Sequence, residues 1–387
     1  MVRVCPGMGA VCPLGALGNI GRGRFCPSLS GFRPSLSEFV LTSFTRAGGF
    51  NSLALGIKWL TTGYRSRFDW LDQDPACTAI SSDNALIHDA LQGARRRGIR
   101  TWLLVVASIY QAKQFGVKPS TGYWGDATGL YDLDFPGLGD RIELLLDEVA
   151  ELFGTETDGI VVELEFCDGE APHRIPIYNE WAKANGRPDF DAIKQIRLEP
   201  RAYPYYHWRD FTTSRRIKML SRIERVVRAR GFTGTLTSII ELDSAPMAVL
   251  GNVNLVMLSQ ALPHWPVVTY DSIYDRRRNR LATMDFCVDQ PRSLGLEVYY
   301  LSRGVMTFPL QPGMPPTTLD EQWRMTLEDA ARHKPDILWF MSADARVDGP
   351  VASNVQLPKW GQPDGRTARL KLMRMAGERD LARRNYL

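Results

Sequence analysis

Several large classes of protein are excluded by what this sequence lacks. Its 387 residues include only six cysteines, which are scattered and show no zinc-ligand spacing, so neither a disulfide scaffold nor a structural zinc site is expected. No run of about 18 apolar residues is present, and no membrane span is therefore expected. The net charge of +4 is small for this length, so a nucleic-acid partner is not expected either.

The motifs of several common chemistries are also missing. The sequence has no G-x-S-x-G elbow for a serine nucleophile, no Walker loop and no G-x-G-x-x-G turn for a dinucleotide. Its five histidines are isolated and form no His-x-His pair, so neither a bound metal nor any other cofactor is expected. Carboxylates are the reactive groups that remain.

Three segments are expected from the composition along the chain. Residues 1–36 are rich in Gly, Pro, Arg and Ser and lack the sustained apolar region of a secretory signal. We expect them to be a disordered leader or translated sequence upstream of the true start, with a cytoplasmic location slightly favoured. Residues 37–350 are expected to form one catalytic barrel, and residues 351–387 a helical segment that packs on it.

Apolar patterns with strand and helix periods alternate along the chain. Strands are predicted at 38–45, 52–62, 99–108, 158–166, 233–241, 253–259, 296–303 and 337–344, with helices at 83–97, 136–153, 214–230, 279–290, 318–333 and beyond 365. This order predicts an α/β fold with a parallel sheet, and the count favours a (β/α)8 TIM barrel with long loop insertions at 109–134 and 167–212. A doubly wound open sheet is the alternative.

The stretch 158–170 carries the strongest functional signal. In a strand, side chains alternate between faces, so Ile160, Val162, Leu164 and Phe166 share an apolar face, while Gly159, Val161, Glu163 and Glu165 share the other. This pattern suits a barrel wall, with helices outside and carboxylates turned toward the interior. An exposed strand with two solvated glutamates is the alternative.

More acids stand at or near the carboxyl ends of the predicted strands, where barrel enzymes place their reactive groups. Cleavage of a glycosidic bond needs one carboxylic acid to protonate the leaving oxygen and one carboxylate to attack or stabilise the sugar carbon. Aromatic rings can cover the apolar faces of sugars, although any one of them could equally pack in the core. The predicted catalytic residues are Glu165, Glu241 and Glu163, and the predicted substrate-binding residues are Asp168, Trp59, Tyr270, Asp271, Trp265, Asp344 and Tyr300.

A resemblance rests on three pieces of sequence. They are Tyr131-Asp-Leu-Asp-Phe-Pro-Gly-Leu138, the end of the helix at 148–153, and Asp158-Gly-Ile-Val-Val-Glu163. Over residues 52–346 the chain resembles the TIM-barrel glycoside hydrolase superfamily, in which a catalytic acid lies at the end of strand four; no specific family is assigned. The resemblance implies that Glu163 or Glu165 is that acid. The chain departs from families with a nucleophile on strand seven, because Ser302 and Arg303 stand there.

The sequence thus predicts a glycoside hydrolase that acts on an oligo- or polysaccharide. Glu165 is the predicted general acid/base, with its pKa raised by Glu163 and by partial burial, and Glu241 is the predicted nucleophile or base. Two alternatives stay open: a non-catalytic carbohydrate-binding barrel, and a barrel lyase or isomerase with a divalent metal on Glu163, Glu165 and Asp344. The sugar, the linkage, the stereochemical course and the oligomeric state are not determined.

Overall fold

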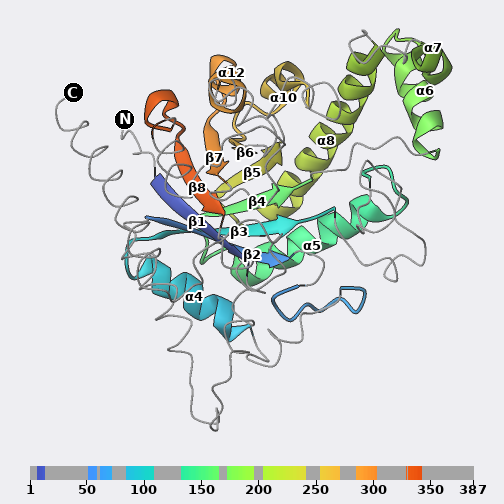
Figure 1. Cartoon of the computed structure of the whole chain (residues 1–387). Coiled ribbons are helices and arrows are strands. Elements are labelled where there is room, and N and C mark those ends of the chain that lie inside the picture. Colours follow the sequence, from blue (N-terminus) through green and yellow to red (C-terminus); the bar gives the residue numbers. More distant parts are fainter. Residues whose placement is uncertain are drawn as a thin grey trace, which may run out of the picture.

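Eight parallel strands, hydrogen-bonded in sequence order, surround one interior in the computed structural model (Figure 1). Each strand pairs with the next, and β1 also pairs with β8, which closes the sheet. The structure describes residues 7–13, 51–58, 62–71, 84–108, 132–164, 172–195, 204–240, 253–270, 285–302, 328 and 330–341. The strands are β1 Gly7–Pro13, β2 Ser52–Lys58, β3 Arg100–Val106, β4 Gly159–Glu163, β5 Thr235–Ile240, β6 Val267–Tyr270, β7 Val298–Ser302 and β8 Ile337–Met341.

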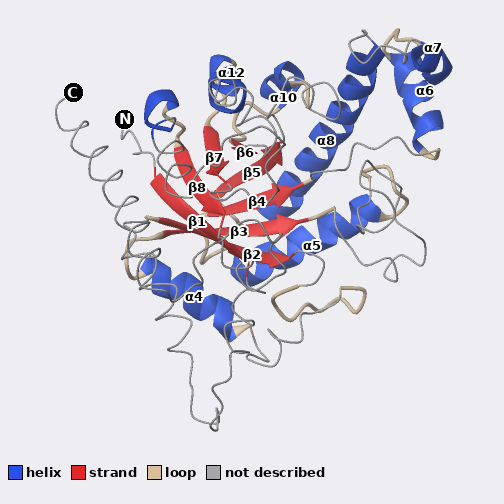
Figure 2. Cartoon of the chain, viewed as in Figure 1, coloured by secondary structure: helices blue, strands red, loops and turns tan. Residues whose placement is uncertain are grey.

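Helices lie around the outside of these strands (Figure 2). They are α4 Ala85–Arg95, α5 Leu138–Phe153, α6 Arg174–Ala184, α7 Phe190–Gln195, α8 Pro204–Ala229, α10 Leu255–Ala261, a π-helical turn Asp285–Asp289 and α12 Gln290–Ser293. The predicted α/β class with a parallel sheet is confirmed, and the strand order differs from that of a doubly wound sheet. A complete set of eight β/α units stays a prediction, because the segments after several strands lie outside the described residues.

The strands of the barrel wall are apolar on both faces, as expected for parallel strands that helices cover. The outer faces pack against α4, α5 and α8 in one large buried cluster that includes Ile160, Val162 and Leu164. Burying one such side chain stabilises the fold by about 1.5–3 kcal/mol. A second cluster fills the interior. The predicted alternation of faces in β4 is confirmed, because Val161 belongs to the inner cluster.

Three aromatic rings interlock inside the barrel. Trp102 and Tyr299 lie in the first halves of β3 and β7, Trp339 lies in the middle of β8, and each is at most 1% exposed. Their centroids are 5.3 to 5.4 Å apart with interplanar angles of 63° to 73°, the edge-to-face geometry that aromatic quadrupoles favour. The amino-terminal half of the interior is therefore a packed core.

Two predictions about elements are corrected by the structure. Gly7–Pro13, part of the expected leader, forms β1, since β2 and β8 supply hydrogen-bonding partners on both sides that outweigh its weak apolar pattern. The strand predicted at 253–259 is helix α10. Asn254 caps it, because its Oδ1 accepts hydrogen bonds from the backbone N–H groups of Val256 and Met257 at 3.1 and 3.2 Å. The rest of the expected leader, the strand at 38–45 and the segment 351–387 lie outside the described residues.

The second predicted loop, 167–212, contains regular structure. It includes α6, α7 and the first turns of α8, which starts ten residues before the predicted start at residue 214. These three helices share an aromatic cluster of their own, centred on Tyr178, Trp208 and Phe211. No helix within the described ranges is long and apolar enough to cross a bilayer.

Candidate functional site

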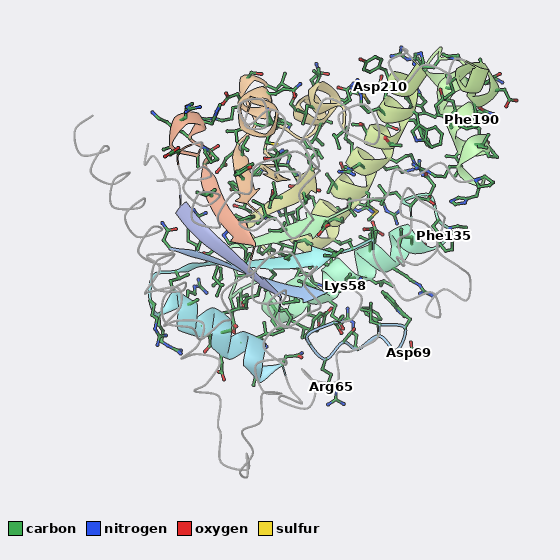
Figure 3. All side chains as sticks on the ribbon, viewed as in Figure 1. Lys58, Arg65, Asp69, Phe135, Phe190 and Asp210 are labelled. Atoms are coloured by element: carbon green, nitrogen blue, oxygen red, sulfur yellow. The ribbon has the colours of Figure 1, made fainter. Side chains whose placement is uncertain are left out.

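The carboxyl ends of β2, β3 and β4 lie side by side, because the strands are parallel and paired in order. They end at Lys58, Val106 and Glu163, and Val106 and Glu163 are register partners. On the other side of β4, Glu163 is the register partner of Ile239 in β5. Figure 3 shows Lys58 at this edge of the sheet. Reactive groups of barrel enzymes lie at this end of the strands.

Glu163 is buried at the end of β4, with 4% of its surface exposed. It follows Gly159 and Val161 on the inner face, where the ring of Trp102 occupies the space that a side chain at residue 159 would need. Its own backbone carbonyl accepts a hydrogen bond from the N–H of Ala107 at 2.9 Å, which fixes the end of β4 to β3. The predicted inward orientation of Glu163 therefore agrees with its burial and its place on the strand.

Lys58, which was not predicted as a site residue, is 1% exposed at the end of β2. Its Nζ donates a hydrogen bond to the carbonyl oxygen of Val106 at 2.9 Å. Burial lowers the pKa of Lys58 well below its usual range, and the nearby charge of Glu163 partly opposes this shift. The site thus contains a buried amine beside a buried carboxylate. The alternation of faces along β2 could have indicated this. Leu55 and Ile57 share the outer face, so Gly56 and Lys58 share the inner face.

A cluster of buried charges connects the segment before α5 to α6 and α8. Asp134 is fully buried and accepts hydrogen bonds from Arg174 at 2.9 Å and from Arg215 at 2.5 Å. Asp132 is 1% exposed and lies 3.0 Å from Nε2 of His173. Each carboxylate therefore has a cationic or imidazole partner, and the cluster fixes the helices beyond the strand ends.

Two of the predicted substrate-binding residues lie in the outer cluster between the barrel and its helices. Trp265 is 2% exposed, and its Nε1 donates to a carboxylate oxygen of Glu224 on α8 at 3.0 Å. Tyr300 is fully buried in the same cluster. Both side chains stabilise the contact between sheet and helices, since an outward-facing position on the wall favours packing. The contact of Trp265 and Tyr300 with substrate stays a prediction.

The other predicted site residues are fixed by the sequence relative to strand ends that the structure describes. Glu165 is two residues beyond the end of β4, Glu241 directly follows β5, and Tyr270 is the last residue of β6. The side chain of Tyr270 and the whole of Glu165, Glu241, Asp168, Trp59, Asp271 and Asp344 lie outside the described residues. Among the described residues, no three His, Cys, Asp or Glu side chains form a group that could hold a metal ion.

The fold is similar to that of solved barrel glycoside hydrolases, as the resemblance predicts for the architecture. A β-galactosidase from the psychrophilic Marinomonas ef1 matches with a TM-score of 0.62 and 10% identity, over 98% of this chain and 60% of that one. Gan42B, a GH42 β-galactosidase from G. stearothermophilus, matches with a TM-score of 0.61 and 10% identity, over 97% of this chain and 57% of that one. A β-galactosidase from Halorubrum lacusprofundi matches with a TM-score of 0.59 and 11% identity, over 86% of this chain and 52% of that one.

The chain thus spans about half to three-fifths of the length of these structures. No protein-family model matches the sequence, and no curated protein matches it. The likeness therefore establishes the architecture and assigns no family.

Proposed function

We propose that this protein is a glycoside hydrolase built on a complete (β/α)8 barrel, and that it cleaves an oligo- or polysaccharide with a pair of glutamates. The observation that carries the proposal is the register between β4 and β5, in which Glu163 pairs with Ile239. If the pairing continues for two residues, Glu165 falls directly opposite Glu241. Both would then follow inward-facing positions, because Val161 and Ile239 belong to the inner cluster.

The expected spacing of these two glutamates fits one of the two classes of mechanism. Neighbouring strands lie about 4.8 Å apart. Carboxyl groups about 5–5.5 Å apart are typical of retaining glycosidases, whereas inverting enzymes need about 6.5–9.5 Å to admit a water molecule. We therefore expect Glu165 to protonate the leaving oxygen and Glu241 to attack the sugar carbon, with net retention of configuration.

Glu163 has a supporting role in this proposal. It lies one inward position below Glu165, and the buried amine of Lys58 is close enough to interact with its charge. Asp168, Asp271 and Asp344 would bind sugar hydroxyls, and Trp59 and Tyr270 would cover apolar ring faces.

Helix α8 supports an extended substrate. Its Arg216 contacts the backbone at the ends of β4 and β5. The twelve residues of α8 before Arg216 therefore continue for about 18 Å along the helix axis from this contact. Figure 1 shows this part of α8 beside α6 and α7, so one side of the barrel opening has a wall against which a sugar chain could lie.

The test is hydrolysis of a panel of nitrophenyl glycosides, β-galactosides and α-fucosides included, together with common polysaccharides. We expect Glu165→Gln and Glu241→Gln to lower kcat by about 10²–10⁴-fold, the usual contribution of a proton-transferring group. Glu180→Gln, which changes an exposed glutamate on α6, is the matched control and should keep full activity. NMR of the first product should show retention.

Three outcomes would contradict the proposal in different ways. Full activity in both variants would reject the assigned residues. Sugar binding without turnover by the wild type would favour a carbohydrate-binding barrel. Turnover that a chelator abolishes would favour a metal-dependent lyase or isomerase.

A further inference from the structure

Arg216 is a buried arginine that lies between α8 and the barrel wall. It is 3% exposed. Its Nη2 donates a hydrogen bond to the carbonyl oxygen of Leu164 at 3.1 Å, and its Nη1 donates to the carbonyl oxygen of Ile239 at 3.4 Å. One guanidinium therefore connects β4 and β5 from outside the barrel.

The two carbonyl groups stand one and two residues before the proposed catalytic pair. Leu164 directly precedes Glu165, and Ile239 is two residues before Glu241. Glu163 and Ile239 are the last register pair between these strands in the described residues. The contacts of Arg216 lie at and just beyond that pair.

Helix α8 is itself fixed to the surrounding structure just before Arg216. The neighbouring Arg215 binds the buried Asp134, and the hydroxyl of Thr213 accepts a hydrogen bond from the backbone N–H of Asn254 at 2.8 Å. The guanidinium thus projects from a rigid support. Its planar fork can hold two acceptors at a set separation, whereas the ammonium of a lysine is a single point charge on a flexible stem.

From this geometry we propose that Arg216 is a positioning residue that sets the separation of Glu165 and Glu241 by holding the ends of β4 and β5 together. The inference rests on the proposed function. Arg216 acts through the backbone and reaches the substrate at no point. A displacement of about 1 Å at a catalytic group can lower a rate by about a hundredfold, so a residue of this kind affects chemistry without contacting it.

The test compares two aryl glycosides of one sugar that the wild type cleaves, a phenyl and a dinitrophenyl glycoside. Phenol is a poor leaving group that needs a well-placed acid, whereas dinitrophenolate leaves without protonation. In Arg216→Lys we expect kcat/KM for the phenyl glycoside to fall about a hundredfold, and that for the dinitrophenyl glycoside, which needs the nucleophile but not the acid, to fall by a clearly smaller factor. Arg225→Lys, which changes an exposed arginine of α8, is the matched control.

A purely structural role would lower both values by the same factor, because it changes only the folded fraction, and that result would overturn the inference. Equal values in Arg216→Lys and the wild type would overturn it as well.

A second measurement does not depend on turnover. Hydrogen exchange is followed by mass spectrometry in peptides that contain residues 159–168 and 235–245, at a temperature where the variant and the wild type are equally folded. In Arg216→Lys we expect exchange about tenfold faster, confined to these two peptides. Unchanged exchange would overturn the inference, even if the wild type cleaves no glycoside and the proposed function has already failed.

Discussion

Lys58 and Val106 are joined by a 2.9 Å hydrogen bond from Nζ to a backbone carbonyl, at a point where both residues are buried. The bond connects the ends of two neighbouring strands through a side chain that is far more often exposed in proteins. Burial disfavours the charged form of Lys58 and lowers its pKa. The free energy of unfolding of the barrel is therefore expected to depend on pH.

Replacing Lys58 with Met should change the pH dependence of stability in a defined direction. The pKa of Lys58 is lowered in the folded state, so the unfolded chain binds the additional proton. The free energy of unfolding of the wild type should therefore rise with pH from the lowered folded pKa up to the unfolded lysine value of about 10.4. Relative to Lys58→Met, we expect this rise to reach at most about 1.4 kcal/mol per pH unit, measured by urea unfolding.

Lys218→Met, which removes an exposed lysine from α8, is the control for this experiment. The free energy of unfolding of Lys218→Met should change with pH in the same way as that of the wild type across this range. Parallel curves for Lys58→Met and the wild type would show that the amine of Lys58 titrates as it does in water.

Gly159→Ala should destabilise the barrel because its Cβ would overlap the ring of Trp102. Overpacking of this kind costs about 1–3 kcal/mol. In Gly139→Ala, the matched change in α5, the new Cβ meets the end of the Arg222 side chain, which can shift, and touches Met219 at an ordinary 3.8 Å, while alanine favours the helix. Chemical denaturation should show a loss of stability in the first variant and none in the second. Equal stabilities would contradict the close approach of β4 to Trp102.

Asp134→Ala should be far more destabilising than Asp140→Ala, although each removes a carboxylate bound to an arginine. Asp134 is buried against Arg174, which is itself fully buried, so its loss leaves this guanidinium with the longer 3.6 Å contact to Asp132 and should cost up to about 3–5 kcal/mol. The side chain of Asp140 is 79% exposed, and its pair with Arg222 should contribute less than about 1 kcal/mol. Thermal unfolding of both variants provides the comparison, and equal shifts in Tm would argue against the buried pair.

Glu148→Ala tests how the segment 62–71 is fixed to α5. The buried carboxylate accepts hydrogen bonds from Tyr64 Oη, Ser66 Oγ and the backbone N–H of Arg67 at 2.9, 2.7 and 2.6 Å. Removing it leaves these donors unsatisfied, which should cost about 2–4 kcal/mol. Glu151→Ala, a change at the exposed partner of Arg67, should have little effect. Limited proteolysis near residues 62–71 should be faster only in the first variant.

The α/β class and the inward face of β4 could be predicted because both follow from local patterns. The alternation of Val161, Val162 and Glu163 needs only the period of a strand, and the helix at 138–153 needs only its apolar stripe. Helix α10 differs from the strand that the sequence predicts, because its apolar run, residues 255–258, is too short for the period to decide. The cap at Asn254 was the missing signal.

The contacts that define the ends of the strands could not be predicted in the same way. Arg216 is 52 residues from Leu164 and 23 from Ile239, and no local pattern distinguishes it from the exposed arginines of α8. Strand β1 depends on β2 and β8, which lie at opposite ends of the barrel sequence. Trp265 and Tyr300 lie in the outer cluster, and an aromatic residue near a strand can serve packing as readily as binding.

The interlocked rings of Trp102, Tyr299 and Trp339 plug the barrel near its amino end. The packed rings block passage along the barrel axis, so a ligand at the carboxyl edge of the sheet enters and leaves on that same side. Access to the carboxyl edge of the sheet is therefore from one end of the barrel.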